Sequence, residues 1–231
     1  MNAGADKMRP VDFDDFAGEY DAALERGISL SGENKDFFAR GRVEWLRQCI
    51  GGTRPERVLD YGCGTGSTSP LLQNVLGASS VIGVDTSKEE IALARRNAGS
   101  GLSFATIDEL KPQGVDVAYC NGVFHHVPLN QRAGAIEYIR DSLRPGGIFS
   151  FWENNPWNPG TRLVMSRIPF DRDAILVSAR EARRLVRAAG FEVLSTHFLF
   201  VFPKMLRALR KLERPLTSLP LGAQYQVLCR K

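Results

Sequence analysis

The sequence predicts an α/β protein built on one doubly wound, mostly parallel β-sheet. Short β-rich segments alternate with segments of helical periodicity, which is typical of parallel sheets whose strands are joined by crossover helices. The length of 231 residues suits one core with a helical cover, and no internal repeat or linker divides the chain. With 43% apolar and 24% charged residues, the composition excludes collagen, coiled-coil and low-complexity proteins.

The first 50 residues are expected to form a lid and one helix. Residues 1–32 are polar and acidic with scattered aromatic side chains, among them Tyr20, too sparse for a core but suited to cover another part of the molecule. From residue 33 to residue 50 the apolar positions recur at helical spacing, and Gly51 and Gly52 end the pattern. We therefore predict an N-terminal helical lid.

Seven strands and three further helices are expected after the lid. The strands are predicted at residues 57–61, 80–84, 102–106, 115–120, 148–152, 191–200 and 224–229. The helices are predicted at residues 87–97, 131–143 and 179–189, with a Pro-rich stretch at residues 154–170. Because right-handed crossovers place helices on both faces of such a sheet, a ligand is expected at the carboxyl ends of the strands.

A glycine loop follows the first of these strands. Gly62, Gly64 and Gly66 stand between a strand and a helix, where the backbone must bend sharply and let a ligand approach closely. Asp60 lies just before the bend, and Asp85 ends the second strand, nineteen residues beyond Gly66, where it can accept hydrogen bonds from a ribose diol. Ser67 occupies the place of the third glycine of a dinucleotide fingerprint, and the lysine of a phosphate-binding loop is missing.

These residues resemble the class I S-adenosylmethionine-dependent methyltransferases, in particular the small-molecule, type 11/12-like branch. The segment Asp60-Tyr61-Gly62-Cys63-Gly64-Thr65-Gly66 is similar to the first motif of that family, and residues 143–147 are similar to its turn before the fifth strand. The resemblance covers residues 55–153. It implies a Rossmann-like sheet with an antiparallel last strand, S-adenosyl-L-methionine as cofactor and S-adenosyl-L-homocysteine as product.

The resemblance also implies which residues bind the cofactor. Asp60 would order the glycine loop, Asp85 would bind the ribose hydroxyls, Ile107 would pack on the adenine, and Tyr20 would close over the cofactor. The family's acid at the adenine amine aligns with Thr106 here, so either Thr106 or Asp108 would take that role. The implied cofactor-binding set is Tyr20, Asp60, Gly62, Cys63, Gly64, Gly66, Asp85, Thr86, Thr106, Ile107, Asp108 and Asn121.

Two histidines follow the fourth strand, where the methyl group should emerge. A neutral imidazole of His126, or of His125 beside it, could accept a proton from an acceptor hydroxyl, amine or activated carbon, or the pair could only shape the pocket. Glu153 ends the fifth strand and would orient a substrate or base, or else be a solvated acid. We predict no metal, because Asn121 and Gly122 replace the carboxylates of metal-dependent relatives.

The remaining segments are expected to select the acceptor. These segments are residues 1–50, 154–177 and 203–221, around a core at residues 55–153 of a single domain. Between Pro203 and Pro215, apolar and basic residues alternate at helical spacing, which predicts an amphipathic basic helix. This helix would either pack over the substrate pocket with a solvated basic face or contact an anionic membrane surface or a lipid-like acceptor through residues 203–215.

The charge is distributed unevenly. Residues 1–160 carry 16 Lys and Arg against 21 Asp and Glu, a net charge of −5, whereas residues 161–231 carry 14 against 5, a net charge of +9. A basic segment permits nucleic acid, a membrane surface or an anionic substrate as partner. No RNA-binding module or aromatic-basic stacking pattern is visible, so nucleic acid is not the expected partner.

The predicted function is methyl transfer from S-adenosylmethionine to a small-molecule or lipid-like acceptor by in-line displacement. An RNA methyltransferase and a non-catalytic protein of the same fold remain alternatives. The four cysteines are widely spaced, and the chain has neither the layout of a signal peptide nor an apolar run long enough to span a membrane. We therefore expect a reduced cytoplasmic enzyme, and the oligomeric state is left open.

Overall fold

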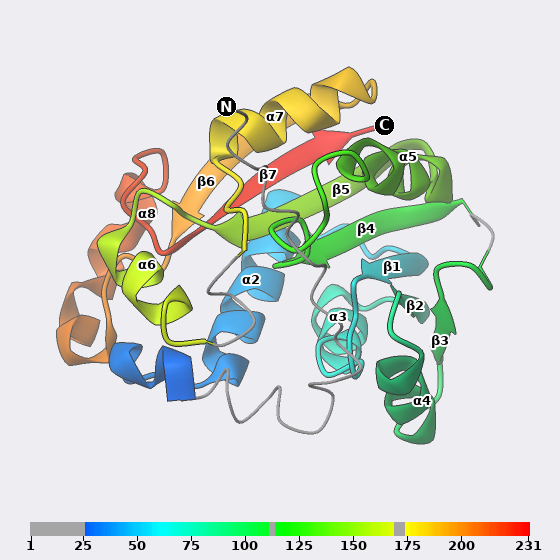
Figure 1. Ribbon diagram of the computed structural model, residues 1–231, viewed down its shortest axis with the longest axis horizontal. Helices are drawn as coiled ribbons and strands as arrows, with labels where there is room; N and C mark the ends of the chain where they lie inside the picture. Colours follow the sequence, from blue (N-terminus) through cyan, green and yellow to red (C-terminus); the bar gives the residue numbers. More distant parts are fainter. Residues whose placement is uncertain (1–25, 111–113, 169–173) are drawn as a thin grey trace, which may run out of the picture.

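The computed structural model describes residues 26–110, 114–168 and 174–231, and its centre is one seven-stranded sheet (Figure 1). The strand order is β3-β2-β1-β4-β5-β7-β6. The bounds are β1 Arg57–Tyr61, β2 Ser80–Asp85, β3 Leu102–Thr106, β4 Val115–Asn121, β5 Leu143–Asn154, β6 Glu192–Leu199 and β7 Gln224–Arg230. Only β7 runs antiparallel to its neighbours, β5 and β6, so the predicted fold class is confirmed. Residues 1–25 of the predicted N-terminal lid lie outside the described residues, so the lid stays a prediction.

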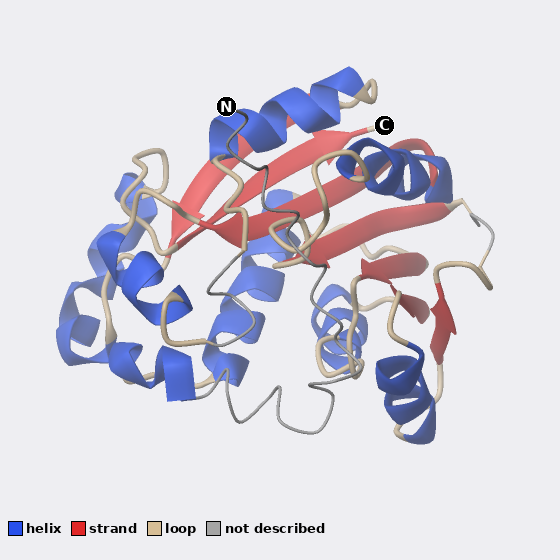
Figure 2. Cartoon of the chain, in the orientation of Figure 1, coloured by secondary structure: helices blue, strands red, loops and turns tan. Residues whose placement is uncertain are grey.

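Helices cover both faces of this sheet (Figure 2). Their bounds are α2 Lys35–Cys49, α3 Ser69–Leu76, α4 Lys88–Arg96, α5 Arg132–Ser142, α6 Pro159–Met165, α7 Ala179–Ala188 and α8 Glu213–Leu216, with 3₁₀ helices η2 Ser29–Ser31 and η3 Lys204–Leu212. Leu46 of α2 and Leu72 of α3 are buried in one cluster with Trp152 of β5. Ile139 of α5 and Val186 of α7 belong to the cluster on the other face.

Side-chain caps fix where several helices begin. The side chain of Asn34 accepts from the backbone N–H of Phe37 at the start of α2, and Ser87 and Ser178 cap α4 and α7 in the same way. Each cap satisfies a backbone donor that the first helical turn leaves unpaired. The start of α2 matters most for function because Lys35 and Arg42 of this helix line two adjoining cavities.

Two segments differ from the sequence-based expectation. The Pro-rich stretch contains α6, which starts with Pro159 in the first turn and is capped by the Asn158 side chain. The predicted single helix between Pro203 and Pro215 was wrong: η3 and α8 divide the segment, and Leu206 departs from helical dihedral angles. The Arg210 guanidinium donates to the Phe202 carbonyl, and the Glu213 carboxylate accepts from the Phe202 N–H, so both side chains hold the segment against the chain that precedes it.

The strand order creates a crevice at the carboxyl end of the sheet. From β1 the chain continues through β2 and β3 toward one edge, whereas β4 and β5 lie on the other side of β1. The loops after β1 and β4 therefore diverge, and ligands of doubly wound folds bind between such loops. Within the described ranges, no helix is long and apolar enough to cross a membrane.

A buried hydroxyl joins β7 to the segment before α7, and its removal tests this packing. The Tyr225 hydroxyl, fully buried, donates to the Val177 carbonyl at 2.7 Å. We expect Tyr225→Phe to lower the free energy of unfolding by about 1–2 kcal/mol, because the carbonyl loses its partner in a dry site. Urea denaturation measures this change. Tyr138→Phe is the matched control, since its half-buried hydroxyl lies 3.4 Å from its acceptor; equal losses in the two variants would contradict the assignment.

Candidate functional site

A cavity of about 470 Å³ lies in the crevice at the carboxyl ends of β1, β2 and β4. Its lining includes eight of the predicted site residues: Gly62, Cys63, Gly64, Asp85, Thr86, Ile107, Asn121 and His126. These residues come from the ends of four parallel strands and from the loops that follow them, which meet at one edge of the sheet. Its size is that of a site for one small organic ligand.

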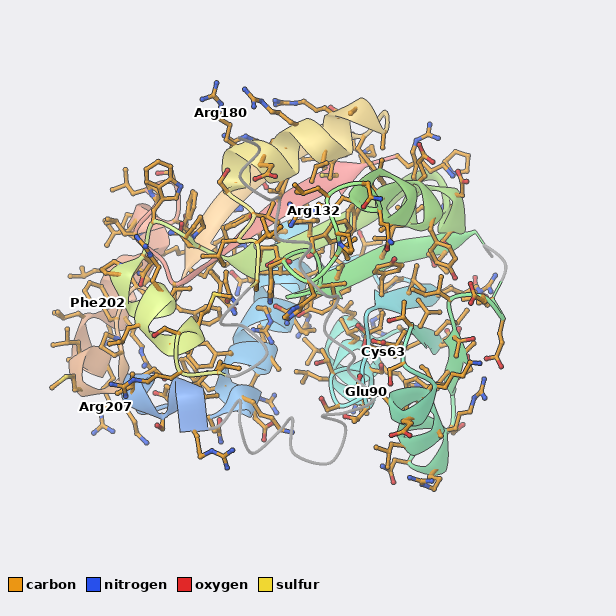
Figure 3. All side chains as sticks on the ribbon, viewed as in Figure 1. Cys63, Glu90, Arg132, Arg180, Phe202 and Arg207 are labelled. Carbon is orange, nitrogen blue, oxygen red and sulfur yellow. The ribbon has the colours of Figure 1, made fainter. Side chains whose placement is uncertain are left out.

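The glycine loop forms one wall of this cavity. Gly62 and Gly64 adopt φ angles of 71° and 54°, a region that other residues rarely occupy. A Cβ on Gly62 would lie 2.2 Å from Val123, and one on Gly64 would lie 3.1 Å from the Glu90 carboxylate, which Figure 3 labels beside Cys63. The glycine loop therefore forms a cradle in which backbone atoms face the cavity. Side chains at these positions would clash with neighbouring residues.

Asp85 ties the end of β2 to this loop. Its carboxylate accepts from the Gly64 N–H at 2.9 Å and from the Ser87 N–H at 3.0 Å while lining the cavity. A carboxylate oriented by two backbone donors keeps lone pairs for a ligand, because each oxygen accepts more than one bond. The arrangement suits a diol.

Asp60 lies beneath the loop and does not line the cavity. Its carboxylate, 3% exposed, accepts from the Ser69 hydroxyl at 2.7 Å. Burial raises the pKa of Asp60 to about 7, with a further rise from Asp85, whereas the Ser69 hydrogen bond and the nearby Arg42 charge oppose the rise. Asp60 therefore orders the start of α3 from below the loop.

The other predicted cofactor residues occupy different places. Ile107 lines the cavity, whereas Thr106 is buried behind it and Asp108 is exposed and outside the lining. Gly66 also lies outside, where a Cβ would come within 2.7 Å of the Phe104 ring. Tyr20 lies outside the described residues. Of the two candidates at the adenine, the structure thus brings neither Thr106 nor Asp108 to the cavity wall.

Cys63 is a neutral part of the cradle. Burial and neighbouring carboxylates raise the pKa of the Cys63 thiol, and its sulfur lies 3.6 Å from the Gly64 carbonyl. A thiol in such surroundings stays protonated and unreactive. Among the residues that the structure describes, no group of three or more His, Cys, Asp or Glu side chains could hold a metal ion, and the absence of a metal stays a prediction.

His125 and Glu153 form a buried pair after β4 and β5. Nδ1 of His125 lies 2.6 Å from Oε2 of Glu153, and the two side chains are 3% and 0% exposed. The other carboxylate oxygen accepts from the Phe124 N–H at 2.7 Å. Glu153 is therefore not a solvated strand-end acid. By bonding Nδ1, the carboxylate fixes the orientation of the His125 ring, and with it the position of the second ring nitrogen, Nε2.

A second cavity of about 480 Å³ adjoins the first, and His125 lines this one whereas His126 lines the first. Both cavities share Lys35, Arg42, Asn121 and Gly122 in their linings. The second cavity is walled by apolar side chains, among them Phe37, Phe38, Val164, Met165, Ile168, Phe200 and Phe202. The aromatic rings of Phe38 and Phe200 meet edge to face at 5.0 Å. Its chemistry suits a flat or extended apolar ligand.

Phe200 is held in this wall by an unusual backbone. Its φ of 65° is the only positive value of a non-glycine residue among those described. The ring lies over Gly41 of α2, where a Cβ would come within 2.7 Å of it, and the Phe200 carbonyl accepts from the Ala223 N–H. Strained backbone of this kind persists where surrounding contacts hold it, and it concentrates at ligand sites.

Arg42 was missed by the sequence analysis, although it lies between the two cavities. The side chain is 7% exposed, with Nε donating to the Tyr119 hydroxyl at 3.0 Å and Nη1 donating to the Gln224 side chain at 2.9 Å. These partners are neutral, so the guanidinium can still bind an anionic group. The sequence contained one signal for Arg42: it lies four residues from both Phe38 and Leu46, on the same face of the helix. A charged residue on a buried helical face is rare.

Known proteins resemble this chain in sequence. The methyltransferase domain family matches residues 58–147. The chain is 31% identical over 176 residues to a ubiquinone biosynthesis O-methyltransferase of Aeromonas salmonicida, and the alignment covers 71% of this chain and 69% of the relative. It is 30% identical over 155 residues to the enzyme of the same name from Alkalilimnicola ehrlichii, covering 62% of this chain and 61% of that protein.

A solved structure shares the fold. The 1,6-didemethyltoxoflavin-N1-methyltransferase of Burkholderia thailandensis, with bound 1,6-didemethyltoxoflavin and S-adenosylhomocysteine, is similar with a TM-score of 0.63. The likeness covers 99% of this chain and 93% of that chain at 19% sequence identity. At this identity the similarity concerns the fold.

The raised pKa of Asp60 predicts a pH-dependent stability. An unfolded Asp titrates near pH 4, so between about pH 4 and pH 7 the unfolded chain loses a proton that the folded chain keeps. The free energy of unfolding therefore falls as the pH rises through this range. Asp60 accounts for a fall of up to about 4 kcal/mol. Asp60→Asn removes this titration. Urea denaturation at pH 5 and pH 8 should show the variant gaining stability relative to the original protein at the higher pH.

Asp141→Asn is the control, because this exposed carboxylate of α5 lines neither cavity. It should leave the pH dependence unchanged. If Asp60→Asn and the original protein lose stability in parallel between pH 5 and pH 8, Asp60 is not the buried acid described.

Proposed function

Because the chain belongs to the class I S-adenosylmethionine-dependent methyltransferases, we propose that it methylates a hydroxyl of a small, apolar or lipid-like acceptor. The observation that carries the proposal is the pair of cavities that share Asn121 and Gly122, with the His125–Glu153 pair beside their junction. Two relatives are named as O-methyltransferases, which supports an oxygen acceptor.

The first cavity fits S-adenosylmethionine. Gly62 and Gly64 supply a cradle without side chains, Asp85 supplies an oriented carboxylate for the ribose hydroxyls, and Ile107 supplies an apolar wall for the adenine. Arg42 supplies a buried cation for the carboxylate of the methionine part. The ribose hydroxyls and the carboxylate of the cofactor thus each have a partner of matching chemistry along the cavity.

The second cavity holds the acceptor. Apolar walls exclude water and align an apolar molecule against the junction at Gly122, and such positioning supplies much of the rate of a bimolecular displacement. When bound, S-adenosylmethionine would supply an electrophilic methyl carbon: the acceptor oxygen bonds to this carbon as the carbon–sulfur bond breaks, and S-adenosylhomocysteine is the leaving group. The protein must orient the acceptor and, when the acceptor is a hydroxyl, provide a base that takes up its proton.

His125 is the base of this proposal. A hydroxyl placed in the second cavity transfers its proton to Nε2 of His125 as its oxygen becomes the nucleophile. Glu153, bonded to Nδ1, holds the ring and stabilises the imidazolium that forms, because the carboxylate is buried against it. The sequence analysis ranked His126 first; we assign that residue to the wall of the cofactor cavity instead.

Cofactor binding is the first test. Calorimetry with S-adenosylmethionine and S-adenosylhomocysteine should show binding to the purified chain. Asp85→Asn should weaken it about tenfold to a hundredfold, because hydrogen bonds to a charged group are lost. The exposed Asp141→Asn variant, with the same chemical change, should bind normally. Absence of binding by the unmodified protein would exclude methyl transfer and leave a non-catalytic fold.

The two histidines should separate in kinetics. With labelled cofactor and the best substrate from a panel of hydroxylated aromatic compounds, His125→Asn should lower kcat about a hundredfold to ten-thousandfold without weakening cofactor binding. Glu153→Gln should lower kcat as well, since it leaves the ring without its carboxylate.

His126→Asn is the neighbouring control. It should change mainly the affinity for cofactor, because His126 lines the first cavity. The large loss of kcat should therefore be confined to His125→Asn. A large loss of kcat in His126→Asn and a small one in His125→Asn would identify His126 as the base instead.

A further inference from the structure

The segment of η3 exposes its apolar side chains to solvent. Met205 is 88% exposed, Leu212 is 54% exposed, and Leu206 and Leu209 are 43% and 40% exposed. No residue of η3 is buried. These apolar side chains therefore lie largely on the outer surface, and the packing of the segment over a substrate pocket stays a prediction. We call the surface formed by Lys204, Met205, Leu206, Arg207, Leu209, Lys211, Leu212 and Arg214 the η3 surface.

The η3 surface is also strongly basic. Lys204, Arg207, Lys211 and Arg214 are exposed, and within the described parts of the chain none of the four forms an ion pair with a carboxylate. The acid of this segment, Glu213, is half-buried and bonded to the Phe202 backbone. The outward charge is therefore uniformly positive, with apolar side chains between the cations.

The inner side of the segment is anchored. Arg210 forms an ion pair with Glu33 at 2.9 Å, and its guanidinium carbon lies 4.5 Å from the centre of the Phe37 ring. It also donates to the Phe202 carbonyl at 3.2 Å. One cation thus faces inward and fixes η3 against the wall of the second cavity, while the others face outward, as Figure 3 shows for Arg207.

The second cavity reaches the molecular surface at the same end of the protein. Leu30 and Leu163 both line this cavity and are 47% and 49% exposed, and Pro203, which also lines it, directly precedes η3. A Cβ on Gly32 would lie 2.9 Å from Lys204, so η2 and η3 are in contact beside this opening. Any large partner on the η3 surface would face the mouth of the acceptor cavity.

We propose that the η3 surface docks on an anionic phospholipid bilayer. Exposed apolar side chains can enter the interface while surrounding Lys and Arg side chains meet the negative headgroups, and both parts contribute to affinity. Charge complementarity selects this partner over a second copy of the chain. A symmetric contact would bring the same cations of two copies together, with no outward-facing acid on this surface to balance them.

Vesicle sedimentation tests the proposal without any cofactor or acceptor. The full chain should bind vesicles of phosphatidylcholine containing phosphatidylglycerol, and should not bind vesicles of phosphatidylcholine alone. The triple variant Lys204→Glu, Arg207→Glu, Lys211→Glu should bind the anionic vesicles about a hundredfold less tightly or worse, because each cation near the surface contributes about fivefold. Met205→Ser with Leu212→Ser should lower the affinity about tenfold at unchanged net charge.

The matched control reverses three exposed cations on another helix. The control variant carries Arg180→Glu, Arg184→Glu and Arg187→Glu in α7, and Arg180 lies far from Arg207 in Figure 3. Each substitution removes two units of positive charge, so the net charge changes from +4 to −2, the same change as in the η3 triple variant. This control should retain most of the vesicle binding. Cofactor binding by calorimetry should be unchanged in every variant, which establishes that each one is folded.

Three results would overturn the proposal. The first is that the unmodified protein does not bind anionic vesicles at low salt. The second is that both triple variants lose binding equally. The third is a dimer in sedimentation velocity that the Met205 and Leu212 substitutions dissociate. The first two results exclude a specific lipid surface, and the third assigns the η3 surface to a second copy. Because cofactor binding is measured separately, none of these results bears on methyl transfer.

Discussion

The Glu153 carboxylate is buried at the end of β5 and must be satisfied by the loop that follows β4. The Phe124 N–H and Nδ1 of His125 supply the two short hydrogen bonds that do so. A buried charge without partners costs several kcal/mol, so the need to satisfy this carboxylate constrains the conformation of the loop after β4. The loop in turn places Gly122 and the imidazole at the junction of the two cavities.

The burial of Glu153 also gives neighbouring residues different roles. His125 and His126 are adjacent in sequence with ring centres 4.0 Å apart, yet they line different cavities, and the bond to Glu153 holds His125 at the second one. Arg42 crosses from α2 to the same junction and is held by Tyr119. A helix, two strand ends and one loop therefore converge on a small region, where cofactor and acceptor can meet.

The strands and the glycine loop were predictable from sequence because their signals are local. Short β-rich runs predicted the bounds of β1 and β3 correctly, and the place of Gly62 and Gly64 between a strand and a helix predicted the cradle. Contacts distant in sequence were not predictable: nothing local distinguishes His125 from His126 until Glu153 is beside one of them. The prediction of a single helix at η3 was wrong for a related reason. Helical periodicity does not reveal the contacts of Arg210 and Glu213 with the Phe202 backbone, which hold this segment against the preceding chain.

The central claim is that the two cavities hold the two partners of one reaction. A crystal structure with bound S-adenosylhomocysteine tests it most directly. The account predicts the ribose hydroxyls on Asp85 and the sulfur at Asn121 and Gly122, facing the second cavity beside His125. A product molecule seated in the apolar cavity, or one whose sulfur faces away from that cavity, would contradict it.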